Sequence, residues 1–562
     1  CLRLSRVGNM DKLATIGNLA FSECSALESI GNMSNVTSIG ERAFANCSKL
    51  TKIDDIPKLE IIGEGAFEEC RMLESIGNLD KLKEIPNGLF SGLEKLASVG
   101  DMSSATSIGA SAFEGCTALV SVGDLSSVTT IGASAFKECD SLASVGNLSS
   151  LKELPKDVFF GLKKLVSVGD LSSVTSIGAG AFEDCYSLAS LGNLSNVTEI
   201  GNSAFMGCSA LESVGDMSNV TRIDSFAFHS CKSIANIGDL DSVTFIGYAA
   251  FNQCTALKSI GNMPNVTRID EGAFRYCSAL ETIGDMPKLE QAGPYMLAQC
   301  SVLKSVGNLN SLTVISDRMF EEARSLTSLG NLSSVTTIDY RAFYGCRSLK
   351  SLNNLNSLTS IESNAFTECT SLTSVGNLDK VKTIGDSAFS NCTSLTSVSN
   401  LSNVTSIGSS AFNKCSSITS IGDLNSLKSL GGAAFAKCTS LTSVGNMSNV
   451  MSIGDSTFSG CTALQAVVLP DGLEVLGDDA FLNCAALTAL PTLPEGLTTV
   501  GENVFRGTAA WKDAANWTDG LLYADGWLLE SRDSARTTLS LAPGTRGIAA
   551  GALREHAALA AV

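Results

Sequence analysis

Cysteine is the residue type in this chain with the widest chemical range, since a thiolate can attack a substrate, bind a metal or form a disulfide. All 19 cysteines fall in one register, and most follow a phenylalanine by three residues, as Cys185 follows Phe182. Leu93, Leu162 and Ala323 occupy the same position in other copies, which regular pairing of neighbouring thiols would not allow. We therefore predict a column of buried, reduced thiols that act as compact hydrophobic groups. Disulfides between neighbouring copies are the alternative.

Other residue types offer little catalytic or metal-binding chemistry. The two histidines, His229 and His556, lie far apart in the sequence, so neither a catalytic triad nor a histidine metal site is expected. The Cys-x-x-Cys spacing that is typical of zinc sites is missing. Asn and Asp interchange at one recurring position, as at Asn147 and Asp170, which favours a hydrogen-bonded ladder over a calcium site. We predict a protein that is not an enzyme and that binds no cofactor or metal.

A 23-residue repeat positions these side chains. Phe recurs every 23 residues from Phe21 to Phe481, with Leu297 in one of the places. Ala, Phe and Cys around each such position have the spacing of one helical turn, and the Leu-x-Ser-Val segment that follows predicts a short strand closed by Gly-Asn or Gly-Asp. One copy cannot bury its apolar residues alone. We therefore predict a solenoid of about two dozen stacked coils, each with a short β-strand, a helical turn and loops.

Composition narrows the range of partners. The formal net charge is −18 and the pI is about 4.7, and an acidic surface repels the phosphate backbone of nucleic acids. We expect no nucleic-acid partner. No apolar run approaches the roughly 20 residues that a membrane-spanning helix needs, so no transmembrane segment is predicted in this stretch of chain.

The repeat is broken near the C-terminus. After Phe505 the period is lost until Leu539, and this gap holds all three tryptophans. Apolar residues on both sides of Asp525-Gly526 predict a β-hairpin that turns at that dipeptide. The repeat then resumes around Ile548. Both ends of the sequence fall inside a repeat, so we expect a fragment of a longer protein.

Three segments follow from this pattern. We predict a regular solenoid over residues 1–504, a non-repeat insertion with a probable hairpin over 505–538, and a resumed, truncated repeat over 539–562.

The repeat resembles a known family. The string Ile-Gly-x-x-Ala-Phe-x-x-Cys-x-x-Leu at this period resembles the BspA-like, treponemal-type leucine-rich repeats, and the copy that runs from Val467 to Phe481 has that family's strand-Leu-Pro form. Most other copies carry Gly followed by Asn or Asp where the family usually has Leu-Pro, so their strand-to-loop corner is expected to differ. The resemblance covers essentially the whole chain and implies a leucine-rich-repeat solenoid. It also implies a microbial cell-surface protein that binds host or matrix proteins.

Two functional hypotheses follow. The first is a non-enzymatic protein-binding or adhesion scaffold at the cell surface or outside the cell. The alternative is a structural subunit that braces a larger intracellular assembly. Trp and Tyr are enriched at binding hot spots, so the candidate protein contacts are Trp511, Trp517, Tyr523 and Trp527 in the insertion. These aromatic residues could instead pack the hairpin onto the edge of the solenoid.

Overall fold

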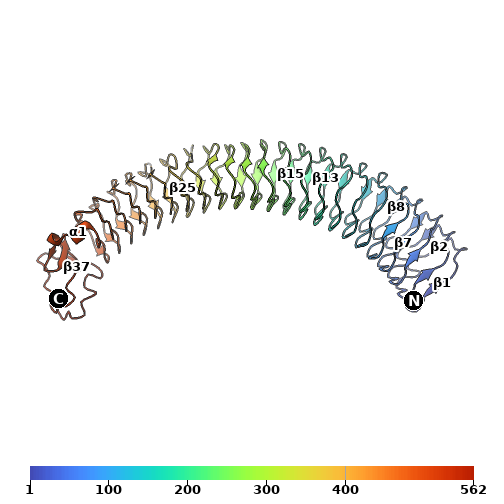
Figure 1. Ribbon diagram of the computed structural model, residues 1–562, viewed down its shortest axis with the longest axis horizontal. Coiled ribbons are helices and arrows are strands. Elements are labelled where there is room, and N and C mark those ends of the chain that lie inside the picture. The colour runs from blue at the N-terminus through green and yellow to red at the C-terminus, as the bar shows by residue number, and fades with distance from the viewer. Residues whose placement is uncertain (353, 399, 562) are drawn as a thin grey trace. The chain divides into compact units, whose positions relative to one another are not determined.

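The computed structural model describes residues 1–352, 354–398 and 400–561 (Figure 1). It contains two compact units, Cys1–Met286 and Pro287–Val562. In each unit the backbone forms successive coils, and each regular coil contributes up to two short strands. One set of strands carries an Ile, or another apolar residue, in its second position and is called here the Ile ladder. The other set mostly begins with Ser and is called the Ser ladder.

Both ladders run through the first unit. Its Ile ladder consists of β2 (Thr15–Ile16), β4 (Ser38–Ile39), β6 (Ile61–Ile62), β8 (Glu84–Ile85), β10 (Ser107–Ile108), β11 (Thr130–Ile131), β12 (Glu153–Leu154), β13 (Ser176–Ile177), β14 (Glu199–Ile200), β15 (Arg222–Ile223), β16 (Phe245–Ile246) and β18 (Arg268–Ile269). Its Ser ladder consists of β1 (Arg6–Val7), β3 (Ser29–Ile30), β5 (Lys52–Ile53), β7 (Ser75–Ile76), β9 (Ser98–Val99), β17 (Ser259–Ile260) and β19 (Thr282–Ile283). Isolated bridges such as Ser167 to Ser190 carry this ladder between β9 and β17.

The second unit has the same two ladders. Its Ile ladder consists of β20 (Gln291–Ala292), β22 (Val314–Ile315), β24 (Thr337–Ile338), β25 (Ser360–Ile361), β26 (Thr383–Ile384), β28 (Ser406–Ile407), β30 (Ser429–Leu430), β32 (Ser452–Ile453), β33 (Val475–Leu476) and β34 (Thr499–Val500). Its Ser ladder consists of β21 (Ser305–Val306), β23 (Ser328–Leu329), β27 (Ser397–Val398), β29 (Ser420–Ile421) and β31 (Ser443–Val444).

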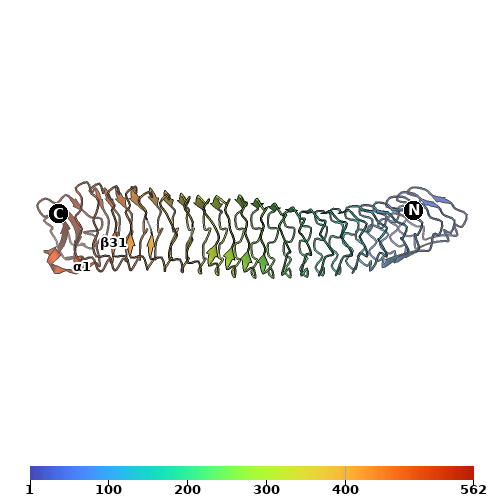
Figure 2. The ribbon, with the colours of Figure 1, turned by 90° about the horizontal axis from the view of Figure 1, so that it is seen from above.

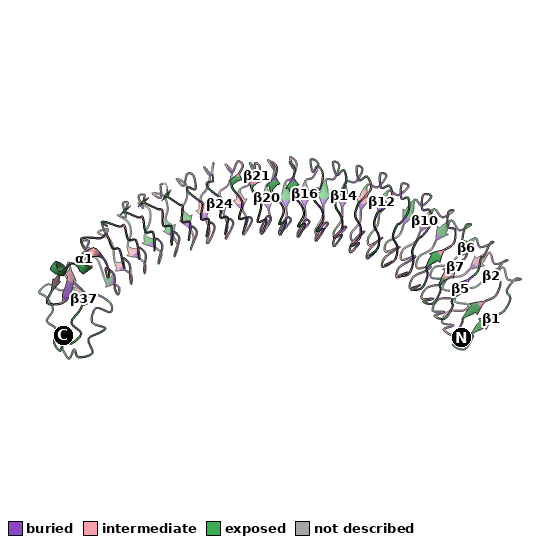
Figure 3. Ribbon diagram, in the orientation of Figure 1, coloured by how far each residue is buried: buried purple, intermediate pink, exposed green. Residues whose placement is uncertain are grey.

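Neighbouring strands of a ladder are parallel and displaced by one repeat. In the first unit Glu199 pairs with Arg222 and Ile200 pairs with Ile223. Successive side chains of a strand point to opposite faces, so the first residue of each Ile-ladder pair faces outward and the second is buried (Figure 3). The outward column can therefore vary while the inward column must stay apolar.

Phenylalanine rings form the centre of the core. Successive coils of each unit lie side by side (Figure 2). The ring centroid of Phe205 lies 5.3 Å from that of Phe182 and 5.2 Å from that of Phe228, and the stacked rings are within 10° of parallel. These three side chains are fully buried. Stacked rings of this kind add stability beyond the burial of their area. The predicted burial of the Phe column is confirmed except at Phe21, which is half-buried.

The predicted helical turn around each Phe is wrong. Among the described residues, the α-helix α1 (Ala509–Lys512) and the 3-10 helix η1 (Ala514–Asn516) both lie outside the regular coils. A regular coil instead makes consecutive four-residue turns around its Phe. The amide of Cys185 donates to the carbonyl of Phe182 at 3.2 Å, and Gly180 and Asp184 adopt positive φ angles of 62° and 59°.

Hydrogen bonding between coils explains the absence of a helix. The amide of Gly180 donates to the carbonyl of Asn202 at 2.8 Å, and that of Phe182 donates to Ala204 at 2.7 Å, both in the next coil. In an α-helix each amide would bond to the residue four positions earlier along the same segment. Because Gly180 and Asp184 are left-handed, every second amide of the turn segment points toward the neighbouring coil instead. The spacing of Ala, Phe and Cys therefore reflects a stack of turns.

The Ile ladder is a second difference from the sequence interpretation, which placed one strand in each coil, at the Ser-Val segment. A strand of two residues, such as β14 (Glu199–Ile200), has too few positions to show an alternating pattern. The signal that could have identified it is the Ile that recurs once in nearly every copy, five residues before the Phe.

The insertion forms a small mixed sheet within the second unit. Strands β35 (Trp517–Thr518), β36 (Leu521–Ala524) and β37 (Trp527–Ser531) are antiparallel, and β37 pairs in parallel with β38 (Gly547–Ile548). The turn between β36 and β37 lies at Asp525-Gly526, where the sequence predicts it, and both residues have positive φ angles, of 42° and 79°, as a two-residue hairpin turn requires. The segment boundaries at 504/505 and 538/539 stay a prediction.

Ser387 tests the turn geometry that replaces the helix. Its φ is 53°, and its amide donates to the carbonyl of Ser409 at 2.8 Å. A left-handed L-residue costs about 1–2 kcal/mol, and glycine loses about 0.5–1 kcal/mol through backbone entropy. We expect Ser387→Gly to raise the local free energy of unfolding by about 0.5–1 kcal/mol, measured by native-state hydrogen exchange.

The matched control for this substitution is Ser374→Gly, which changes the same residue type in the Ser ladder. Because the ladder backbone is extended, that change should lower the local free energy of unfolding by about 0.5–1 kcal/mol. Equal destabilisation by both substitutions would show that Ser387 does not have the left-handed conformation.

Candidate functional site

The cysteine column has a structural role in the core. The thiol of Cys185 donates to the carbonyl oxygen of Phe159 in the preceding coil at 3.1 Å, and Cys254 donates to Phe228 at 3.2 Å. The same contact recurs along the column, as between Cys70 and Phe44. Cysteine is thus a small apolar side chain that also satisfies a buried carbonyl. The sequence interpretation found the burial of the thiols but not this hydrogen bond.

Cys185 and Cys254 are poor nucleophiles. Burial raises the pKa of Cys185 and of Cys254 to about 12, so the reactive thiolate is scarce near neutral pH. The predicted column of free, buried thiols is confirmed for every cysteine except Cys1, which is exposed. Within residues 1–352, 354–398 and 400–561, no group of three or more His, Cys, Asp and Glu side chains is arranged to bind a metal ion.

His556 is the residue that comes nearest to a catalytic arrangement. It occupies the place of a column cysteine in the resumed repeat, and its Nε2 lies 2.8 Å from Oγ of Ser531. A serine nucleophile needs a histidine whose Nδ1 is held by a third group. Nδ1 of His556 is buried and has no hydrogen-bond partner among the described residues. Ser531 therefore provides a hydrogen-bond partner for Nε2 of the buried His556 ring, and no third residue completes a triad among the described residues.

Two of the predicted contact residues come together in the insertion. The rings of Trp511 and Trp517 meet edge to face with centroids 6.0 Å apart. Nε1 of Trp511 donates to Oε2 of Glu530 at 2.6 Å, and Nε1 of Trp517 donates to the carbonyl of Trp511 at 2.8 Å. Both side chains are half-buried, so each indole is held by the protein while part of it faces solvent.

An arginine completes this group. The guanidinium carbon of Arg532 lies 4.2 Å from the ring centroid of Trp511 and 3.6 Å from that of Trp517, and Nη2 of Arg532 donates to the carbonyl of Trp511 at 3.0 Å. A guanidinium over an indole face is a favourable cation–π contact. We call Trp511, Trp517 and Arg532 the insertion cluster. Arg532 was not among the sequence candidates, although it lies one residue beyond the hairpin.

The other two candidates have different surroundings. Trp527 is 6% exposed and packs on Gly547, where an added Cβ would come within 2.5 Å of the indole. The side chain of Tyr523 is half-buried, and its hydroxyl accepts a hydrogen bond from the amide of Ala542 at 3.3 Å. Trp527 therefore joins the hairpin to the resumed repeat, and Tyr523 lies at the edge of the insertion.

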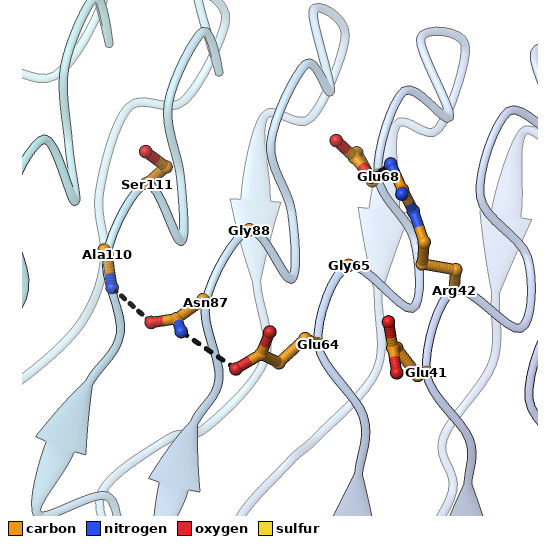
Figure 4. Close-up of a pocket in the computed structure, with 9 residues that line it drawn as sticks. All are labelled: Glu41, Arg42, Glu64, Gly65, Glu68, Asn87, Gly88, Ala110 and Ser111. Carbon is orange, nitrogen blue, oxygen red and sulfur yellow. Dashed lines mark hydrogen bonds and ion pairs between the residues drawn. The ribbon is translucent and has the colours of Figure 1, made fainter.

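A shallow hollow lies on the first unit, at the corner that follows the Ile ladder (Figure 4). It has a volume of about 340 Å³. Its lining is polar: Arg42 pairs with Glu68 at 2.5 Å, and Nδ2 of Asn87 donates to Glu64 at 2.9 Å. Arg42 and Glu68 neutralise each other on an open surface, while Glu64 keeps its negative charge and accepts a hydrogen bond from Asn87. The hollow lacks the apolar, enclosed lining that small-molecule sites usually have.

A tyrosine–arginine group in the second unit was missed by the sequence interpretation. The guanidinium of Arg318 lies 5.1 Å from the ring centroid of Tyr295 and 4.8 Å from that of Tyr340. That of Arg341 lies 5.6 Å from Tyr340 and 4.5 Å from Tyr344. Tyr and Arg are common at binding hot spots. The available signal was that three of the chain's seven tyrosines fall within residues 295–344.

The fold defines the class of protein. Parallel ladders displaced by one 23-residue repeat, with buried columns of Leu, Ile and Phe, form a leucine-rich-repeat β-solenoid. The family model described as the BspA type leucine rich repeat region matches residues 1–120, 83–212, 198–327, 313–442 and 382–512. The chain therefore belongs to the BspA type leucine-rich-repeat family, as its sequence resemblance predicts.

Several solved structures are similar to this chain. A leucine-rich repeat protein from Bacteroides ovatus is 24% identical, with 84% of this chain and 94% of that chain covered and a TM-score of 0.33. A leucine rich cell surface protein from Faecalibacterium prausnitzii is also 24% identical, with 65% and 82% covered and a TM-score of 0.33. A T. pallidum leucine-rich repeat protein is 30% identical, with 33% and 78% covered and a TM-score of 0.25. No curated protein matches the sequence.

Leucine-rich-repeat proteins are typically non-enzymatic scaffolds that bind other proteins, and no arrangement among the described residues indicates catalysis. In the part of the chain that the structure describes, no helix has the length and apolar character needed to cross a membrane.

The buried thiols predict an alkaline loss of stability. The thiol of Cys254 has an ordinary pKa of 9.0 when unfolded and a pKa of about 12 when folded. Above pH 9 the unfolded chain releases this proton while the folded chain keeps it, so the free energy of unfolding falls by about 1.4 kcal/mol per pH unit for each such thiol. We expect Cys254→Ala to remove about 2 kcal/mol of the loss between pH 7.5 and 10.5, measured by urea unfolding.

Alanine suits the column because Ala323 occupies it naturally. A Ser259→Ala control, which changes an outward residue of β17, should keep the full alkaline loss. Identical pH dependence in Cys254→Ala and the unaltered chain would mean that Cys254 titrates normally when folded.

Proposed function

We propose that this protein is an adhesion scaffold displayed at the cell surface, and that it binds a protein partner through the insertion cluster of Trp511, Trp517 and Arg532. The observation that carries the proposal is a group of two tryptophans and an arginine that stays partly exposed although hydrogen bonds hold its members in place. These residue types are the ones most enriched where binding energy concentrates. Relatives of this family are described as cell-surface proteins, which supports display.

The insertion cluster is arranged to bind at low entropic cost. Glu530 fixes the indole of Trp511, and the carbonyl of Trp511 fixes both Trp517 and Arg532. Side chains that are ordered before binding lose less conformational freedom when a partner arrives. Tyr523, at the edge of the same insertion, extends the proposed contact, while the buried Trp527 packs on Gly547 and anchors the hairpin.

The outward surfaces of the regular coils are similar to one another, so they offer a partner little that distinguishes one coil from the next. Much of the outward surface consists of Ser and Thr, and many of their hydroxyls bond to the preceding coil. The hydroxyl of Thr198, for example, donates to the carbonyl of Thr175 at 3.2 Å, and that of Thr221 donates to Thr198 at 3.1 Å. The insertion interrupts this uniform surface with large, anchored side chains, which favours it as the main contact.

The double variant Trp511→Ala/Trp517→Ala tests the proposal. Removing a hot-spot side chain typically weakens binding by 2 kcal/mol or more, so we expect at least about a thirtyfold loss of affinity. The measurement is biolayer interferometry of the purified chain against a panel of extracellular-matrix proteins. The matched control is Tyr186→Ala, which removes an aromatic side chain that is 45% exposed in the first unit, and it should keep full affinity.

Deletion of residues 506–538 extends the test to the whole insertion. Hydrogen exchange of the Ile-ladder amides checks that the coils before the insertion stay folded in each variant. A matrix protein that binds the intact chain and the deletion variant with equal affinity would refute the insertion as the contact site.

A further inference from the structure

A groove crosses several neighbouring coils of the first unit. The hollow of Figure 4, with a volume of about 340 Å³, adjoins a second hollow of about 430 Å³, and the two share Glu64, Asn87 and Ala110. The second hollow continues over the outward residues of β8, β10 and β11 in the Ile ladder. We call the two hollows together the corner groove.

Two glycines open the corner groove. Gly65 and Gly88 lie in neighbouring coils, at the position two residues before Phe that Arg42 and Ser111 occupy in the coils on either side. Both glycines have positive φ angles, of 57° and 59°, which glycine adopts without steric cost. A Cβ added at Gly88 would meet no atom within 4 Å. The surface is therefore hollow here because two consecutive coils lack a side chain.

The corner groove carries net negative charge. Its charged lining residues are Glu41, Glu64, Glu68, Glu84 and Arg42, which leaves a formal charge of −3. The one cation, Arg42, pairs with Glu68 at 2.5 Å, and Figure 4 shows it extending toward Glu68 and away from Glu41. Among the described residues, no Lys or Arg forms an ion pair with Glu41, Glu64 or Glu84. Three exposed carboxylates are thus left without a counter-charge.

Two of these carboxylates lie in the same register. Glu41 and Glu64 both stand three residues before Phe, in coils that are about 4.7–4.9 Å apart. Like charges placed side by side in this way are destabilising. The same position holds the neutral Asn18 and Asn87 in the coils on either side, so the repulsion is confined to the groove. A bound cation would relieve it.

We propose that the corner groove binds an extended, arginine-rich segment of a protein partner, whose guanidinium groups pair with Glu41, Glu64 and Glu84. The planar guanidinium matches a carboxylate through two parallel hydrogen bonds, which an ammonium group cannot form. The proposal goes beyond the proposed function and relies on it only in taking the chain to be a protein-binding scaffold, since the groove lies outside the insertion.

The shape of the groove favours a chain segment over a small ligand. From Glu41 to Ala110 the groove crosses three coil steps, which span about 14 Å at strand spacing. In an extended segment alternate side chains point to one face and residues rise about 3.3 Å each, so arginines at positions i, i+2 and i+4 span about 13 Å. Within the described part of the chain no group of His, Cys, Asp and Glu is arranged to hold a metal ion.

The charge of the whole chain supports the encounter, and the groove selects the site. A net charge of −18 attracts basic segments from a distance. Exposed ion pairs are individually weak, so we expect modest affinity that depends on three simultaneous contacts. Because the Debye length falls from about 10 Å at 0.1 M salt to about 3 Å at 1 M, binding should weaken as salt is added.

The test measures the fluorescence anisotropy of a labelled peptide, Gly-Arg-Thr-Arg-Thr-Arg-Gly, with the full chain at about 0.1 M salt. We expect saturable binding that weakens at least about fivefold in the triple variant Glu41→Gln/Glu64→Gln/Glu84→Gln, because three ion pairs are lost. A peptide with the neutral analogue citrulline in place of each arginine should lose at least as much affinity. Thermal melting verifies that the variant is folded.

The matched control is Glu28→Gln/Glu74→Gln/Glu212→Gln, which removes three exposed carboxylates of the same unit outside the groove. It should bind the peptide as the unaltered chain does. An equal loss in both triple variants would show that the peptide responds to the overall charge and would overturn the proposal. Unchanged binding in the groove variant, unchanged binding of the citrulline peptide, or no saturable binding by the intact chain would also overturn it.

The insertion variant Trp511→Ala/Trp517→Ala separates this proposal from the proposed function. It should keep full peptide binding, because the corner groove belongs to the first unit. Loss of peptide binding in that variant, with the groove variant unaffected, would place the peptide site in the insertion. The corner groove would then have no binding role, while the proposed function would stand.

Discussion

Hydrogen bonds between the backbones of neighbouring coils are the constraint on which the rest of the structure depends. A 23-residue coil is too small to bury its own Phe and Leu side chains, so it must bond and pack against the next one. The turn segment meets this demand by directing alternate amides, such as those of Gly180 and Phe182, to carbonyls one repeat later. Left-handed residues at two positions of each turn follow from that arrangement, and so does the absence of a helix.

The same stacking separates a constant interior from a variable exterior. Each inward position meets its own copy in the adjacent coil, which is why Phe stacks on Phe and why a column thiol reaches the carbonyl of the preceding Phe. Outward positions are free of this requirement. Large side chains can therefore replace Ser or Thr there at little cost to the fold. Neighbouring coils bring such replacements together, as in the contact of Arg222 with Phe245 and in the tyrosine–arginine group around Arg318.

The sequence predicts the features that repeat and misses those that depend on one conformation or one pair of coils. The Phe period predicts the solenoid, and Asp525-Gly526 predicts the hairpin, because both are local or periodic signals. The left-handed conformation of Asp184 is harder to predict from the sequence than the period of Phe, because many residue types occur at the left-handed positions. Arg318 and Tyr340 lie 22 residues apart, and only the stacking register shows that they touch. Trp511 and Trp517 could be predicted as contact residues because tryptophan is enriched at binding sites. Their contact with Arg532 depends on how the insertion folds, which the sequence pattern does not show.

Amide hydrogen exchange in the turn segment from 178 to 186 tests the central claim most directly. If coil-to-coil hydrogen bonds organise the fold, the amides of Gly180, Phe182 and Asp184 should exchange as slowly as those of Ile177 and Ile200 in the Ile ladder, because all of them open only when adjacent coils separate. Fast exchange of the turn amides beside a protected Ile ladder would contradict the account. The turns would then be peripheral loops, and the strands alone would hold the coils together.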